Sequence, residues 1–117
     1  MPKTVIHLFH DDDASLTSGS HVAERIRQVA GEQGLELEVY IFGPAQKALA
    51  DTQSEARAEY NAQIDALVQA GVPVGACLNS ATAAGTVDAL TERGITLQYA
   101  RDAFTRYGLE GAAVISF

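Results

Sequence analysis

The only cysteine of the chain, Cys77, stands where a reactive thiol is most useful. It ends the apolar run Val72–Cys77, which is typical of a buried strand, and a helical pattern follows directly. The start of a helix stabilises a thiolate, the reactive form of cysteine, through free N–H groups and the dipole. The dipole contributes ~0.3–1 kcal/mol, whereas lowering a thiol pKa from about 8.5 to about 7 takes ~2 kcal/mol. Position alone therefore leaves two interpretations open, a modestly activated thiol and a buried structural cysteine.

Polar residues close to Cys77, or at the end of another predicted strand, are the remaining candidates for a site. Asn79 and Ser80 could donate hydrogen bonds to a bound sulfur or anion, or simply cap the helix that follows. His10, at the exit of the first apolar run, could serve as a base or a cation beside the thiol. His7 lies inside that run, so we expect it in the core. A cysteine hydrolase needs a histidine near the thiol, and only positions 7, 10 and 21 provide one.

Three consecutive aspartates, Asp11–Asp13, follow His10. Carboxylates suit Mg²⁺ or Ca²⁺, but neighbouring residues of a loop rarely converge on one ion, and no EF-hand pattern follows. We expect a loop over residues 10–19 whose acids are solvated and cap or precede the next helix. The chain also lacks a Walker loop and the CxxC, HExxH and GxSxG motifs. The sequence therefore predicts neither a resident metal nor a cofactor.

Short apolar runs alternate with helical patterns along the chain. Such alternation predicts an α/β fold, flavodoxin-like in appearance, with a five-stranded, mostly parallel central sheet in a single domain, residues 1–117. Ligands of open α/β sheets bind beyond the carboxyl ends of the strands, the edge at which Cys77 falls. The expected strands are 5–9, 35–42, 72–77, 95–99 and a buried strand 112–117. The expected helices are 20–34, 45–50, 52–71, 79–93 and 103–108.

Composition narrows the classes of partner. The net charge is −7, and the eight basic residues are scattered, so we expect no nucleic-acid partner. No apolar run approaches the ~18 residues of a membrane span, so we expect no membrane partner. One cysteine cannot form an internal disulfide, which favours a reducing, cytoplasmic location.

Three segments carry a resemblance to a known family. They are the strand that ends in His10-Asp11-Asp12, the strand Tyr40–Pro44, and the segment Gly71–Ser80 around Cys77. Together with the apolar strand that ends at Phe117, the chain resembles the DsrE/DsrF-like family, which includes small YchN-like and TusD-like sulfur-relay proteins. The resemblance implies a three-layer α/β/α fold and assembly with itself as a homotrimer or homohexamer.

The same resemblance implies a role for the cysteine. In the sulfur-carrying members, a cysteine after this strand accepts sulfur as a persulfide and passes it to a partner, and Cys77 stands at that position. The function implied is a sulfur carrier or sulfurtransferase-like protein with sulfur donor and acceptor proteins as partners. The alternative is a non-catalytic oligomer that binds a small molecule or a partner and in which Cys77 is structural.

Overall fold

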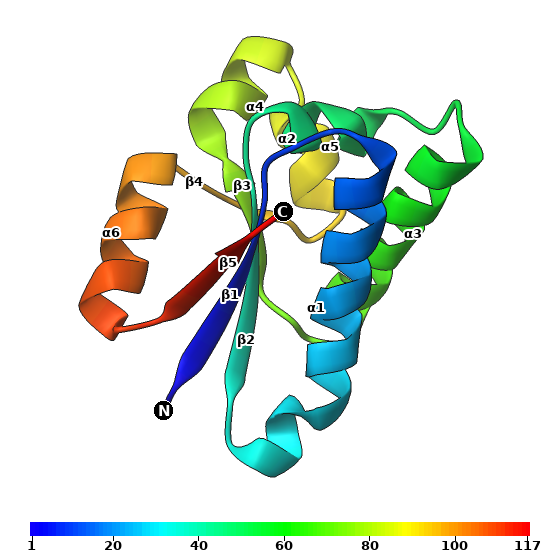
Figure 1. Cartoon of the computed structure of the whole chain (residues 1–117). Helices are drawn as coiled ribbons and strands as arrows, with labels where there is room; N and C mark the ends of the chain where they lie inside the picture. Colours follow the sequence, from blue (N-terminus) through cyan, green and yellow to red (C-terminus); the bar gives the residue numbers. More distant parts are fainter.

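Five parallel strands form one sheet in the order β4-β3-β2-β1-β5 (Figure 1). The computed structural model describes all residues, Met1–Phe117. All four neighbouring pairs run parallel, which confirms the predicted sheet. The strands are β1 (Lys3–Leu8), β2 (Glu36–Ile41), β3 (Val74–Cys77), β4 (Thr96–Gln98) and β5 (Ala113–Ser116).

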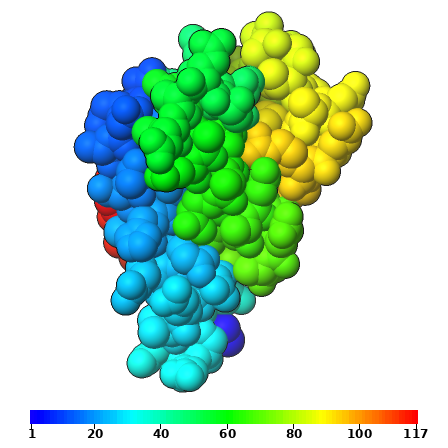
Figure 2. All heavy atoms as spheres, turned by 90° about the vertical axis from the view of Figure 1, so that its right-hand side faces the viewer, coloured from blue at the N-terminus to red at the C-terminus, as the bar shows by residue number.

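Helices cover the two faces of the sheet unequally. The long helices α1 (Asp13–Gln33) and α3 (Glu55–Gln69) lie side by side on one face (Figures 1 and 2). Only α6 (Ala100–Glu110) lies on the other face, so the arrangement is three-layered, α/β/α. Shorter helices surround the carboxyl ends of the strands. They are α2 (Pro44–Lys47), the 3₁₀ helix η1 (Ala48–Ala50), α4 (Leu78–Ala84) and α5 (Val87–Glu92).

The hydrophobic core divides along the sheet because successive strand residues point to opposite faces. The main core of 19 buried residues includes Ile6 and Val39 and lies under α1 and α3. A smaller cluster of Val5, Tyr40, Ala103 and Tyr107 lies under α6. Neither hydrophobic cluster covers the outer strand β5, and all residues of this strand are exposed. The expectation of a buried last strand was therefore wrong, because β5 is an edge strand beyond the reach of α6.

The expected loop over residues 10–19 is mostly helix. Helix α1 begins at Asp13 because Asp12 caps it, accepting hydrogen bonds from the N–H of Ser15 at 3.0 Å and its hydroxyl at 2.8 Å. The polar first turns hid this start from a search for apolar spacing. Gly19 lies in this part of α1, where a side chain would collide with Leu8 of β1. The glycine therefore permits close packing and does not mark a loop.

The structure also differs from the helices predicted over residues 52–71 and 79–93, in the start of the first and in the continuity of the second. Ser54, and not Thr52, caps α3, since its hydroxyl accepts from the N–H of Arg57 at 3.1 Å. The helix expected over residues 79–93 is two helices, because Gly85 adopts a left-handed conformation (φ 71°) that ends α4. Helix α4 itself begins one residue after Cys77, so Cys77 is its N-cap.

Candidate functional site

Main-chain contacts on two sides hold Cys77 at the junction of β3 and α4. On one side, β3 pairs with β4, and Cys77 lies opposite Gln98. On the other side, the buried amide of Gln46 takes the place of a strand. The N–H of Cys77 donates to Oε1 of Gln46 at 3.0 Å, and Nε2 of Gln46 donates to the carbonyl of Cys77 at 2.9 Å. The residue changes from strand to helix with its backbone fixed (φ −73°, ψ 123°).

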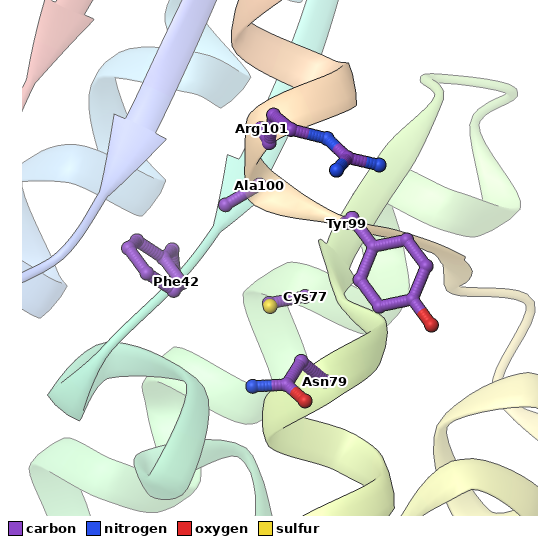
Figure 3. Close-up of a pocket in the computed structure, with 6 residues that line it drawn as sticks. All are labelled: Phe42, Cys77, Asn79, Tyr99, Ala100 and Arg101. Atoms are coloured by element: carbon purple, nitrogen blue, oxygen red, sulfur yellow. The ribbon is translucent and has the colours of Figure 1, made fainter.

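The Cys77 side chain forms part of the wall of a pocket of about 500 Å³ at the carboxyl ends of β2, β3 and β4. Figure 3 shows the sulfur in the middle of the lining residues, with Ala100 and Arg101 on one side of it and Asn79 on the other. Only 4% of the residue is exposed, so the pocket is the route by which a reactant would reach the sulfur. Besides Cys77, the lining residues are Phe42, Asn79, Tyr99, Ala100 and Arg101.

The starts of two helices meet at the sulfur. Burial disfavours the thiolate and would raise the pKa of Cys77, but polar groups near the sulfur outweigh burial and hold the pKa below its usual value. These groups are the N–H and hydroxyl of Ser80 and the N–H groups of Ala100 and Asn79. Ser80 and Asn79 belong to the first turn of α4, whereas Ala100 is the first residue of α6. A second helix thus supplements the dipole of the first.

A buried tyrosine near Cys77, Tyr40, depends on a glycine. The ring of Tyr40 lies across Gly75, where an added Cβ would be 3.2 Å from Cδ1 of the tyrosine. The phenol donates to the carbonyl of Gln98 at 2.9 Å. Its pKa is raised, first by burial and then by the neighbouring Cys77. Gly75 therefore gives Tyr40 room to reach β4 beside the reactive sulfur.

An ion-pair cluster fastens α6, and with it one wall of the pocket, to the sheet. Glu38 of β2 accepts from Arg106 at 2.7 Å and from the hydroxyl of Tyr107 at 2.7 Å. Lys3 of β1 donates to Glu38 at 3.1 Å and to Glu110 at 2.6 Å. Burial would raise the pKa of Glu38, but these hydrogen bonds prevail and lower it to about 2. The cluster keeps a carboxylate ionised at the contact between helix and sheet.

The structure separates the residues considered for the site into two groups. Asn79 lines the pocket, and Ser80 follows it in the first turn of α4, near the sulfur, where it helps to lower the pKa of Cys77. His10 does not line the pocket; it is exposed after β1, and its ring packs on Phe9 at 5.3 Å between centroids. His7 is half-buried, and its Nδ1 lies 2.9 Å from the hydroxyl of Ser116.

None of the three histidines lines the Cys77 pocket, since His21 borders a separate hollow between α1 and α3. A thiol–histidine pair of the kind that a cysteine hydrolase uses is therefore not formed. The three aspartates after His10 lie at the start of α1, and two of them contact Arg57, Asp11 at 3.9 Å and Asp13 at 3.8 Å. No group of three or more His, Cys, Asp and Glu side chains is placed to hold a metal ion.

Sequence reasoning missed most of the pocket wall. Tyr99 is the N-cap of α6, and Ala100 and Arg101 are its first two residues. Sequence reasoning also missed Gln46 of α2, which lies outside the wall but holds the backbone of Cys77. The only signal in the sequence was the expected strand 95–99, because the carboxyl ends of parallel strands meet at one edge of a sheet; in the structure, the end of β4 lies beside Cys77. Gln46 carried no signal, because a glutamine in a short helix is ordinary.

These features define a class of protein: a parallel α/β/α fold whose cysteine ends the third strand and faces a pocket. The model of the DsrE/DsrF-like family matches residues 3–117, and the chain belongs to that family. Membership indicates a function of the sulfur-relay type, and members of the family are often oligomeric. No curated protein matches the sequence significantly. None of the helices is both long and apolar enough to span a membrane.

Two solved structures share the fold over nearly the whole chain. The conserved protein of unknown function BT1422 from Bacteroides thetaiotaomicron has a TM-score of 0.78 and 18% sequence identity, over 99% of this chain and 94% of that one. The protein of unknown function MTH1491 from Methanobacterium thermoautotrophicum has a TM-score of 0.74 and 22% identity, with complete coverage of both chains. At these identities, the likeness concerns the fold alone.

Proposed function

We propose that this protein is a sulfur carrier that holds sulfane sulfur as a persulfide on Cys77. One observation carries the proposal: the sulfur faces a pocket that is bordered by the first turns of two helices, α4 and α6. N–H groups at a helix start stabilise the thiolate that must attack, and such donors can also stabilise an anionic persulfide that stays bound. Family membership supports the same role.

The transfer needs no oxidant or reductant beyond the donor itself. The thiolate of Cys77 attacks the terminal sulfur of a donor persulfide, R–S–SH. A new S–S bond forms as the donor S–S bond breaks, the proton stays on the transferred sulfur, and the donor leaves as the thiolate R–S⁻. In the second step, an acceptor thiolate attacks the terminal sulfur on Cys77 and regenerates the Cys77 thiolate. Both steps follow the course of thiol–disulfide exchange.

The lining of the pocket suits such anionic reactants. It holds one cation, Arg101, and no acidic side chain, although the chain as a whole carries a net charge of −7. Phe42 and Tyr99 add aromatic surface. His10 lies outside this lining, so in this proposal Cys77 carries the sulfur, while Asn79 and Ser80 bind it.

Intact-mass spectrometry tests the carrier role, because Cys77 is the only cysteine. After incubation with glutathione persulfide and removal of excess reagent, we expect the native protein to gain the mass of one sulfur atom. Dithiothreitol should remove it again. Cys77→Ser should gain none, and Ser116→Ala is a matched control that keeps the thiol. A gain that persists in Cys77→Ser, or no gain in the native protein, would contradict the proposal.

The second candidate is a binding protein in which Cys77 is structural, and the 4% exposure of this residue favours it. Alkylation of the native protein by iodoacetamide distinguishes the two. A carrier should be labelled quickly when folded, with an apparent pKa below that of the unfolded chain. Labelling that occurs only after denaturant has unfolded the protein would favour the structural role.

For partners, we propose a homotrimer or homohexamer in the cytoplasm that meets separate sulfur donor and acceptor proteins. The exposed β5 supports self-association, since Val114 and Ile115 are 41% and 46% exposed on a strand with one free edge. An unpaired cysteine suits a reducing compartment. Light scattering at micromolar concentration should give a small multiple of 12.4 kDa, and the monomer mass would refute the assembly.

A further inference from the structure

Strand β2 ends before it can pair with the reactive end of β3. The last register pair between them is Ile41 with Ala76, and the chain then turns away at Gly43, which has a φ of 67°. Cys77 is therefore left without a strand partner on its β2 side. Its main-chain N–H and carbonyl point to a side chain there, the amide of Gln46.

The Gln46 side chain serves this one purpose. Only 6% of the residue is exposed, and both of its side-chain hydrogen bonds go to the backbone of Cys77, one donated and one accepted. A carboxamide offers a donor and an acceptor in one plane, as a peptide group does, so it completes the ladder as a neighbouring strand would. No capping contact of α2 involves this amide, since that helix starts without a side-chain cap.

We propose that Gln46 is a positioning residue for the reactive sulfur. The inference rests on the proposed role of Cys77 and names the group that sets its reactivity. Cys77 is the N-cap of α4, so its backbone angles decide where Sγ lies relative to the N–H groups of Asn79 and Ser80. By holding both main-chain groups of Cys77, Gln46 keeps the sulfur within reach of these donors. It does so without contacting the transferred sulfur.

Substitution by methionine gives the most direct test. Gln46→Met keeps the length and flexibility of the side chain and removes both hydrogen bonds. We expect a higher apparent pKa for Cys77, with about tenfold less thiolate at neutral pH, the change that corresponds to one pK unit. The pKa is measured from the ultraviolet absorbance of the thiolate and from the pH dependence of iodoacetamide labelling. Gln63→Met, on α3 and without a hydrogen bond to Cys77, is the matched control.

These measurements separate positioning from mere structural support. A residue that only stabilises the fold would change the melting temperature and leave the pKa of Cys77 in the folded state unaltered. Labelling in denaturant should be the same for all variants. An unchanged pKa and labelling profile in folded Gln46→Met would overturn the inference.

A second variant covers the case in which Gln46→Met does not fold. As a neutral acid, the side chain of Gln46→Glu can make both hydrogen bonds. Once ionised, it loses the donor and places a negative charge beside the thiol. We expect its labelling rate to fall below that of the native protein as the new carboxyl ionises. A profile equal to the native one across the pH range would refute the proposal.

The measurement of the Cys77 pKa in Gln46→Met does not depend on the carrier function. It uses no sulfur donor, so a pKa change in Gln46→Met would support the positioning role even if glutathione persulfide left the native protein unmodified. Conversely, sulfur uptake by the native protein with an unaltered pKa in Gln46→Met would leave the carrier role intact and remove Gln46 from it.

Discussion

The carboxylate of Glu38 in β2 links this strand to β1 and to α6, and removing its charge should weaken the contacts between all three elements. It accepts hydrogen bonds from Lys3 of β1 and from Arg106 and Tyr107 of α6, and its side chain is 10% exposed. Glu38→Gln keeps the size of the side chain and two polar atoms. It removes the negative charge that the two cations share. We expect it to loosen α6, whose first residue, Ala100, lines the Cys77 pocket.

The size of the effect follows from the pKa of Glu38, which lies at about 2 and not at the ordinary 4.5. If the whole pKa difference between the unfolded and the folded state contributes to stability, it corresponds to about 3 kcal/mol in the free energy of unfolding. Solvent screens part of the interaction at the rim of the cluster, so we expect about 1–2 kcal/mol. Because the pKa is lowered on folding, this stability is fully present above pH 4.5. It is lost as the pH falls from 4.5 through about 2.

Urea unfolding of Glu38→Gln and of the native protein between pH 7 and pH 2.5 measures the contribution of Glu38 to the free energy of unfolding. At pH 7, the native protein should be more stable by about 1–2 kcal/mol, and the difference should shrink below pH 4.5. Glu36→Gln is the control, on the same strand but exposed and without an ion pair. The reasoning is refuted if the difference is absent at pH 7 or stays constant down to pH 2.5.

Three further substitutions probe the surroundings of Cys77. Ser80→Ala removes a hydroxyl donor and should lower the thiolate fraction of Cys77 about fivefold at neutral pH, equivalent to about 1 kcal/mol; an unchanged labelling rate would count against this donor. Gly75→Ala should push Tyr40 aside and cost about 1–3 kcal/mol in urea unfolding, and native stability would show that the ring has space. Arg101→Glu should slow labelling by anionic iodoacetate more than by neutral iodoacetamide, and an equal effect on both reagents would exclude electrostatic attraction by this arginine.

Local patterns predicted the sheet and the place of Cys77 in it. Apolar runs and helical spacing repeat along the chain, so the alternation of strands and helices is visible without coordinates. The start of α1 was missed because Asp12 and the small residues after it form a polar, capped first turn. The exposure of β5 was missed because an apolar run does not reveal whether its strand lies at the edge of a sheet.

The site was harder to predict because its parts come from separate turns. Nothing within the sequence around Cys77 shows that Ala100 lines the same pocket or that Gln46 holds the backbone of Cys77. Both contacts depend on strand order and register, which place β4 and the turn after β2 on either side of β3. The dipole of one helix predicted a modest effect on the thiol. A second helix start adds to it, and no lysine lines the pocket.

For the cysteine of a sulfur carrier, neutral hydrogen-bond donors are better suited than a charged lysine or histidine side chain next to the thiol. A carrier must attack as a thiolate and later release the sulfur that it took, so neither form can be held too firmly. Nucleophilicity falls together with the thiol pKa, and the best attacking thiol has a pKa near the ambient pH. Hydrogen bonds from Ser80, Asn79 and Ala100 offset the burial of Cys77 and lower its pKa without a neighbouring lysine or histidine. The same N–H groups can receive the thiolate and the persulfide anion in turn, which permits transfer in both directions.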